Sequence, residues 1–393
     1  MSITLSNRVK AVKPSPTLAI TARAAAMRAA GKDIVGLGAG EPDFDTPEHI
    51  KAAAIEALNQ GFTKYTAVDG TPGLKKAVID KFKRDNGLSY QPKQVLVSSG
   101  GKQSFYNLAQ ALLNPGDEVI IPAPYWVSYP DMVLLADGVP VIVAAGQEQG
   151  FKITPAQLKT AITDKTRLLV INSPSNPTGA AYSLDELSAL AEVLQDYPQI
   201  LIATDDMYEH ILWNKGEFVN ILNARPDFYE RTIVLNGVSK AYSMTGWRIG
   251  YAAGPADLIE AMCIIQSQST SNPTSISQVA AETALNGDQS CIDNMMVEFK
   301  KRHDFVVAAL NDIDGVACLP TDGTFYVFPS VHKLIERLNG IDDDLQFAEY
   351  LIEKAGVALV PGSAFGCPGH IRISIATSMA NLEKALERIR QAV

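Results

Sequence analysis

Short runs of consecutive apolar residues alternate with helix-like stretches between residues 95 and 255 of the chain. Seven of these runs are rich in β-branched residues and end in polar or turn-forming residues: QVLVSSGG, DEVIIPAP, VPVIVAA, TRLLVINSP, ILIATDD, RTIVLNG and RIGYAAGP. Strands that are apolar on both faces and separated by helices are typical of a mainly parallel sheet covered on both sides. The pattern predicts an α/β domain with a mainly parallel, seven-stranded sheet.

One helix before this region is marked by its end signals. In TPEHIKAAAIEALNQG, residues 46–61, Thr46 is predicted as the N-cap and Pro47 as the first helical position. Gly61 is predicted as the C-terminal cap.

After about residue 290 the pattern changes to long amphipathic helices with a few strands. The final segment, NLEKALERIRQAV, places four apolar residues on one helical face: Leu382, Ala385, Leu386 and Ile389. We therefore expect an N-terminal arm with part of a small domain in residues 1–48, a large domain in 49–290 and a smaller α+β domain in 291–393.

The composition excludes several classes of partner. The chain has 393 residues, a net charge of -9 and no block of basic residues, so nucleic acids and anionic membranes are disfavoured and a small-molecule partner is favoured. No apolar run approaches a membrane span or a signal peptide, which favours a cytoplasmic location. The four cysteines and five histidines are scattered, so neither a disulfide framework nor a metal site is expected.

Polar residues directly after the predicted strands carry the candidate chemistry, because ligands of an open parallel sheet bind beyond the carboxyl ends of its strands. Gly100 and Gly101 follow the first run and would let N–H groups at a helix start approach a phosphate, although Gly-Gly is also an ordinary turn. The run TRLLVIN continues into SPSNPTG, where two prolines and a glycine make a rigid turn around Asn176, with a cis bond as one option; the alternative is a plain turn.

An acid, a phenol and a lysine follow two further runs. Asp205 and Asp206 end ILIATDD, with Tyr208 shortly after; the alternative is that these acids cap a following helix. Lys240 follows RTIVLNG, and an apolar setting would lower its pKa and make it an amine nucleophile, whereas such a lysine ordinarily faces solvent. A phosphate cradle, an acid, a phenol, an amide and a lysine at one sheet edge are the groups that hold pyridoxal phosphate, so the sequence predicts this cofactor.

The motifs also resemble, in their order, those of the fold-type I pyridoxal-phosphate aminotransferases of class I. The resemblance is to bacterial aspartate aminotransferases of the group that includes aspartate/prephenate aminotransferases. It rests on GAGEPDFDTPEHI, TKYTAVDGTPGL, SSGGKQSFYNL, PAPYWVSYPDM, NSPSNPTGAAY, DDMYEHI, SKAYSMTGWRIGYAAGP and GHIRISIAT, which span nearly the whole chain. It implies transfer of the amino group of L-aspartate to 2-oxoglutarate by a ping-pong mechanism, in a homodimer with shared active sites.

The resemblance implies roles around the cofactor. Lys240 occupies the position of the covalent link and of the general base, Asp205 that of the partner of the pyridine nitrogen, and Arg248 that of the partner of the phosphate. Tyr208 and Asn176 match the donors to the phenolic oxygen. Lys240, Asp205 and Tyr208 are thus the predicted catalytic residues.

It also implies contacts with the substrate and with a second subunit. Trp126 matches the aromatic residue on the cofactor ring, and Tyr65 matches a tyrosine that reaches the phosphate of the neighbouring subunit. Arg372 falls where the substrate α-carboxylate is clamped, with help from the backbone at Gly40. Trp126 and Asn176 also count among the predicted substrate-binding residues.

Two features depart from common family patterns. Relatives often have a serine three positions before the lysine, where this chain has Gly237, so Ser239 and backbone groups are the expected substitutes as phosphate partners. Residues 260–299 contain no arginine or lysine that could bind a distal carboxylate. By resemblance to a group without that arginine, this role falls to Lys102, which also lies in the predicted phosphate cradle, with Ser15 and Thr17; the alternative is a solvated lysine and an ordinary loop.

Other functions were weighed against this interpretation. Prephenate is a plausible second acceptor, and aromatic amino acids follow as substrates. A carbon–sulfur lyase would share Lys240, Asp205 and Arg372, and would form an oxo acid without a stoichiometric amino acceptor. A ligand-sensing regulator domain is disfavoured by the intact cofactor residues, and a nicotinamide dehydrogenase because GLGAGEP leads into Pro42 rather than a helix.

Overall fold

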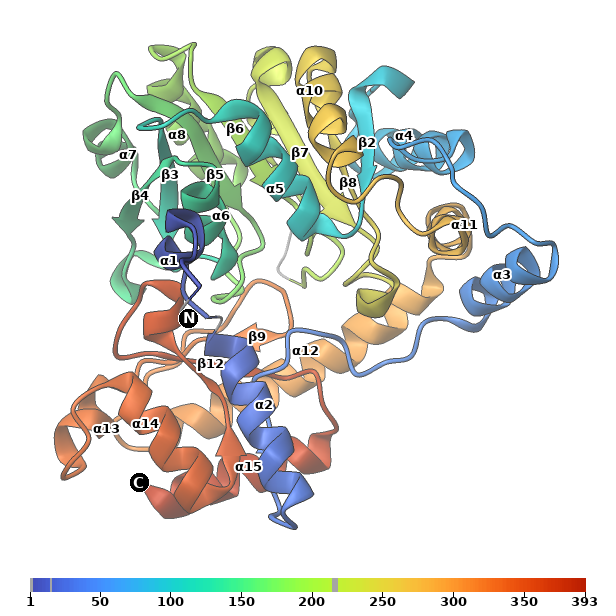
Figure 1. Cartoon of the computed structure of the whole chain (residues 1–393). Coiled ribbons are helices and arrows are strands. Elements are labelled where there is room, and N and C mark those ends of the chain that lie inside the picture. The colour runs from blue at the N-terminus through green and yellow to red at the C-terminus, as the bar shows by residue number, and fades with distance from the viewer. Residues whose placement is uncertain (1–2, 15, 214–217) are drawn as a thin grey trace.

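The computed structural model describes residues 3–14, 16–213 and 218–393. Seven of its strands form one sheet in the order β2-β8-β7-β6-β5-β3-β4, and β8 alone runs antiparallel to its neighbours (Figure 1). The strands are β2 (Val95–Ser98), β3 (Glu118–Ala123), β4 (Val139–Ala144), β5 (Thr166–Asn172), β6 (Leu201–Asp205), β7 (Thr232–Gly237) and β8 (Gly250–Ala253). Each of the seven predicted runs is one of these strands, so the predicted mainly parallel sheet is confirmed.

Helices cover both faces of this sheet. One face carries a core contributed by α4 (Pro72–Asn86), α8 (Leu184–Gln195) and α11 (Ser275–Asn286), and α3 (Glu48–Asn59) packs beside α11. The other face is covered by α5 (Gly101–Leu112), α6 (Ser128–Leu135) and α10 (Ala256–Ser267). Short helices α1 (Asn7–Ala11), α7 (Pro155–Ala161) and α9 (Ile221–Ala224) lie at the margins. The strands other than β4 are therefore largely buried on both faces, as their continuous apolar runs require, whereas the edge strand β4 leaves Val139 and Ile142 exposed.

A second core lies below the sheet in Figure 1 and is built mainly from the C-terminal third. It contains the sheet β11-β12-β9 (Val360–Pro361, Ile371–Ser374 and Tyr326–Val327) and the parallel pair β1 (Val35–Gly36) and β10 (Val357–Ala358). Its helices are α2 (Pro16–Ala29), α12 (Ser290–Asn311), α13 (His332–Arg337), α14 (Asp344–Tyr350) and α15 (Met379–Ala392). Because β1 pairs with β10, the N-terminal segment contributes to this part of the molecule; the division at residues 48 and 290 stays a proposal.

The helices also test two of the sequence predictions. In α15 the four predicted apolar residues are buried, so that face is confirmed. Among the described residues, none of the helices is both long enough and apolar enough to traverse a lipid bilayer.

The predicted start of the helix at residues 46–61 is wrong. This helix, α3, begins at Glu48, with Pro47 at the N-cap position and no side-chain cap. The Thr46 hydroxyl instead donates to the Ser243 carbonyl at 2.7 Å and accepts from the Trp247 indole N–H at 2.9 Å. The Thr46 side chain therefore forms tertiary hydrogen bonds instead of the predicted helix cap.

Candidate active site

The loops that follow β3, β5, β6 and β7 line one cavity of about 280 Å³ at the carboxyl edge of the sheet. Twelve of the predicted site residues line it: Thr17, Gly40, Gly101, Lys102, Trp126, Asn176, Asp205, Tyr208, Ser239, Lys240, Arg248 and Arg372. Strand β3 lies between β4 and β5. The strands that follow β3 in the chain are therefore added first on one side of it and then on the other, so the strand order reverses at β3. Ligands of open α/β sheets bind at such a reversal.

Lys240 stands three residues beyond the end of β7. Its Nζ donates to the Gly40 carbonyl at 2.5 Å. Burial in the cavity, together with the positive charge of Arg372, lowers the pKa of Lys240 from 10.5 to about 8. The amine is protonated below this pH and neutral above it, so it becomes a nucleophile near neutral pH.

The lowered pKa makes a prediction about chemical reactivity. In protein free of bound ligands, reductive methylation of Lys240 by formaldehyde with cyanoborohydride as the reductant is expected to reach half its maximal rate near pH 8, because only the neutral amine reacts. Peptide mass spectrometry of samples quenched across the pH range measures this rate. A synthetic peptide of residues 234–246 is the unburied control, and an equal midpoint in protein and peptide would contradict the assignment.

Asp205 is the last residue of β6 and lies at the floor of the cavity. Its carboxylate accepts hydrogen bonds from the Tyr129 hydroxyl and from the Met207 N–H, the latter at 3.2 Å. Burial raises the pKa of this carboxyl, while the two donors act against the rise. Asp205 thus holds a turn rather than capping a helix, and none of the described lysines or arginines forms an ion pair with it.

Arg372 lies on β12, opposite the sheet edge, with only 2% of its surface exposed. Its guanidinium donates to the Asn176 side chain at 2.9 Å and to the Gly38 carbonyl at 2.8 Å, and it lies over the Tyr326 ring. Its buried Nε has no hydrogen-bond partner among the described residues. A planar cation with a free buried donor is suited to a carboxylate ligand.

Asn176 and Tyr208 complete the walls near Arg372. The peptide bond between Asn176 and Pro177 is cis, as is that between Ser173 and Pro174, which confirms the cis option for this turn. The Tyr208 hydroxyl lies 3.1 Å from the hydroxyl of Tyr326. Burial raises the pKa of Tyr208 well above its ordinary value, so the hydroxyl keeps its proton and can donate it in a hydrogen bond.

Another corner of the cavity is suited to an anion. Gly100 has a φ of 92° at the N-cap of α5, a conformation that favours glycine, and Gly101 begins the helix, which has no side-chain cap at its N-terminus. Arg248 adopts a left-handed φ of 58° and donates to the carbonyls of Thr245 and Ser99. Partial desolvation and the charge of Arg248 lower the pKa of Lys102, which stays exposed and whose Nζ lies 5.2 Å from the centroid of the Trp126 ring. Positive charge and helix N–H groups together favour a phosphate.

Gly237 departs from the common pattern for a steric reason. A Cβ at this position would lie 3.0 Å from the Gly250 Cα and the Ile249 oxygen, and 3.2 Å from the methyl group of Met207. Strands β7 and β8 are so close here that a serine at 237 would require β8 or the adjacent Met207 side chain to shift by a few tenths of an ångström. Ser239 lines the cavity instead.

Two predicted residues stand apart from the cavity wall, and one cannot be placed. Gly100 precedes the lining residue Gly101 as the N-cap of α5. Tyr65 is 92% exposed, so within one chain it contributes nothing to the cavity. Ser15 lies outside the described residues.

Sequence reasoning missed two tyrosines of the site. Tyr129 donates to Asp205, and Tyr326 supports both Tyr208 and Arg372. A signal existed for Tyr129, because it follows Trp126 by three positions at the start of a helix, where residues i and i+3 are neighbours. Tyr326 follows TDGTF in a segment without any comparable pattern.

The fold and this site define an aminotransferase. The family of class I and II aminotransferases matches residues 32–389, and the chain belongs to it, which confirms the predicted class and the fold-type I architecture.

Individual relatives narrow the comparison. The chain is 63% identical over 390 residues to the aspartate/prephenate aminotransferase of Nitrosomonas europaea and 56% identical to that of Cereibacter sphaeroides, with 98% of each chain covered in both cases. The crystal structure of the aspartate aminotransferase from Rhizobium meliloti has a TM-score of 0.96 at 50% identity, covering 100% of this chain and 99% of the other. The aspartate aminotransferase of Thermus thermophilus with maleate gives 0.94 at 45% identity, with 100% of both chains covered.

Proposed function

We propose that this chain is a pyridoxal-phosphate-dependent aminotransferase that moves the amino group of L-aspartate to 2-oxoglutarate, giving oxaloacetate and L-glutamate. One observation carries the proposal: the Lys240 amine, the Asp205 carboxylate and the Arg372 guanidinium line a single cavity. The names of the relatives support aspartate as the donor and prephenate as a second acceptor. A cytoplasmic location also stays a proposal.

The residues of the cavity fit pyridoxal phosphate. The N-terminus of α5, with Ser239 and Arg248, would hold the phosphate; the half-buried Asp205 carboxyl, which forms no ion pair with the described lysines and arginines, would hold the ring nitrogen. Tyr208 and Asn176 would donate to the phenolic oxygen, and Trp126 would lie on the ring. Bound there, the cofactor supplies a carbonyl that captures amines and a ring that accepts an electron pair.

The chain's own residues position the substrate and move one proton. Arg372 would bind the α-carboxylate through its planar fork, which fixes Cα in the cavity next to Lys240. Lys240, with its pKa lowered to about 8, would remove the proton from Cα as a general base and deliver it to the cofactor. The second half-reaction uses the same residues in reverse, so the kinetics are ping-pong.

The side-chain carboxylate of aspartate needs a separate cation. Lys102 and Thr17 both line the cavity, and we propose that they bind this carboxylate together with Ser15. The lowered pKa of Lys102 reflects partial desolvation and the nearby Arg248, and a bound dianion would offset that repulsion.

Single-turnover spectra test the proposed donor. Mixing the cofactor-loaded protein with aspartate alone should bleach the visible band of the bound cofactor rapidly, because the first half-reaction needs no acceptor. Bleaching only by aromatic or neutral amino acids would contradict aspartate as the donor. Continued oxo acid formation from one amino acid, without any acceptor, would favour a carbon–sulfur lyase.

A homodimer with shared sites is the proposed assembly. Tyr65 is 92% exposed and is preceded along the chain by the exposed apolar side chains of Ile55, Leu58 and Phe62, which suit burial against a second copy. We propose that Tyr65 of one chain reaches the phosphate in the other.

Hybrid dimers test this sharing. Tyr65→Ala and Lys240→Ala chains, each weakly active or inactive alone, are co-expressed with different affinity tags. Each hybrid then contains one site with both residues intact, so about half of the wild-type activity per dimer is expected, as measured after two-step purification. Hybrids no more active than the parents would contradict a shared site.

A further inference from the structure

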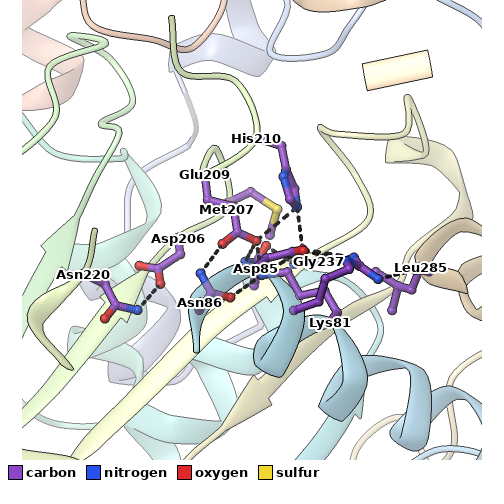
Figure 2. A network of polar contacts seen from close by, with 12 residues as sticks. Lys81, Asp85, Asn86, Asp206, Met207, Glu209, His210, Asn220, Gly237 and Leu285 are labelled. Carbon is purple, nitrogen blue, oxygen red and sulfur yellow. Dashed lines mark hydrogen bonds and ion pairs between the residues drawn. The ribbon is translucent and has the colours of Figure 1, made fainter. Parts of the chain in front are cut away.

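The turn that carries Asp205 and Tyr208 has a second, buried side. Asp205 and Tyr208 line the cavity, whereas Asp206 and Glu209 do not line it. Figure 2 shows Asp206 and Glu209 within a network of polar side chains. Asp206 and Glu209 are 0% and 6% exposed. The same short segment therefore serves the cavity on one side and is anchored on the other.

Glu209 is held by three different partners. It forms an ion pair with Lys81 of α4, and it accepts hydrogen bonds from Asn86 at 2.8 Å and from Asn236 at 2.7 Å. Lys81 is completely buried and also donates to the Asn86 side chain at 2.7 Å. Both carboxylate oxygens of Glu209 therefore have fixed partners.

Asp206 anchors the other end of the turn. Its carboxylate accepts hydrogen bonds from the Thr204 hydroxyl at 2.5 Å and from the Asn220 side chain at 2.8 Å. Its own N–H donates to the Leu235 carbonyl of β7 at 2.9 Å. The turn is thus tied to β6, to β7 and to the segment before α9.

Asn236 connects this network to the strand that leads to Lys240. It is the residue before Gly237 in β7, and its side-chain oxygen accepts the Gly237 N–H at 2.7 Å. Glu209 therefore contacts the strand that positions Lys240 four residues further along. The Glu209 carboxylate thus fixes the position of the turn that contains Asp205 and Tyr208 relative to the segment that carries Lys240.

Lys81 supplies the positive charge of the network around Glu209. Asp85, Glu209 and His210 come close enough to hold a metal ion, but the Lys81 ammonium already lies on the Glu209 carboxylate. Burial raises the pKa of Glu209, but the attraction of Lys81 and His210 outweighs it and lowers the pKa to about 2. The Glu209 carboxylate is therefore ionised at neutral pH.

We infer that Glu209 is a positioning residue of the reaction: its contacts with Lys81, Asn86 and Asn236 fix Asp205 and Tyr208 relative to Lys240. A buried ion pair contributes little net stability over an apolar pair of similar volume, whereas its directed contacts specify position. The inference rests on the proposed function, because it is tested through the kinetics and the visible band of the cofactor that Asp205 and Tyr208 would contact.

Two variants separate positioning from stability. Glu209→Gln keeps the shape of the side chain but leaves the buried Lys81 ammonium with only the more distant Asp85 carboxylate, 4.0 Å away, as its counter-charge. The double variant Lys81→Met with Glu209→Gln removes both charges and so relieves that destabilisation. Asp344→Asn is the control, since this completely buried aspartate binds Ser363 and Gly369 in the small domain, away from the turn.

The measurements are the melting temperature, kcat and KM for aspartate, and the pH midpoint of the visible band of the loaded protein. For Glu209→Gln we expect kcat to fall by roughly 10- to 100-fold, with KM changed by less than about threefold, since displacement of catalytic groups impairs the chemical step. The band midpoint should rise, because a displaced Tyr208 stabilises the phenolate less. The double variant should recover its melting temperature but keep the raised midpoint.

The opposite results would overturn the inference. A double variant with wild-type kcat and midpoint, or an equal midpoint shift in Asp344→Asn, would show that only general stability is affected. If Glu209→Gln fails to fold, the double variant decides. A wild-type protein without any cofactor band would instead refute the proposed function and is recognised before any variant is compared.

Discussion

Lys240→Ala is expected to lower kcat for aspartate by about four orders of magnitude. The variant loses both the amine that captures the cofactor and the base that moves the Cα proton, and general base catalysis alone contributes up to roughly 10⁴-fold. Steady-state assays with aspartate and 2-oxoglutarate measure the loss, and the spectrum of the loaded protein shows whether the Lys240-linked band has disappeared.

Lys240→Arg is the matched control for charge. It keeps a cation next to the Gly40 carbonyl, but a guanidinium stays protonated and offers no neutral amine. We therefore expect it to be as inactive as Lys240→Ala. Adding a small primary amine should partly restore turnover in Lys240→Ala, and activity near that of the wild type in either variant would refute the mechanism.

Arg372→Lys is expected to lower kcat/KM for aspartate by roughly a thousandfold. Losing a buried, hydrogen-bonded charge pair costs about 3–5 kcal/mol, and each 1.4 kcal/mol corresponds to a factor of ten. Lysine keeps the charge but cannot contact Asn176, Gly38 and a carboxylate at once, as the guanidinium fork does. Steady-state kinetics with a range of amino acids measure the effect.

Lys102→Met provides the comparison for the second carboxylate. Arg372 would bind the α-carboxylate that every amino acid has, so its replacement should impair aspartate and alanine alike. Lys102 would bind only the side-chain carboxylate, so its replacement should impair aspartate much more than alanine. An Arg372→Lys variant that loses aspartate but keeps alanine would contradict the assignment of the two cations.

The sheet could be predicted because its signals are local. Each apolar run is contiguous and bounded by turn residues, so every strand appears in the sequence without knowledge of its neighbours. The start of α3 could not be predicted in the same way, since the Thr46 hydroxyl contacts Trp247, 201 positions along the chain. Local sequence propensity predicts Thr46 as the helix cap, but its hydroxyl forms tertiary hydrogen bonds instead.

The candidate site likewise contains residues that local sequence signals predict and contacts that depend on the tertiary structure. Asp205 ends a strand, and Asn176 and Lys240 lie a few residues beyond the ends of two others, so the rule for open sheets brings them to one edge. Tyr129 reaches Asp205 across 76 positions, and the Gly38 carbonyl reaches Arg372 across 334. Those contacts depend on the order of strands and on the packing of the second core, which no local pattern encodes.

The Met207 side chain occupies the space beside Gly237 that a larger residue at 237 would need. The methyl group of Met207 lies where a side chain at 237 would extend, and Gly250 closes the space from β8. A hydroxyl at residue 237 would therefore require β8 or the Met207 side chain to shift by a few tenths of an ångström. A shorter residue at 207 would make room for it, so redesign of this end of the cavity has to begin with its packing.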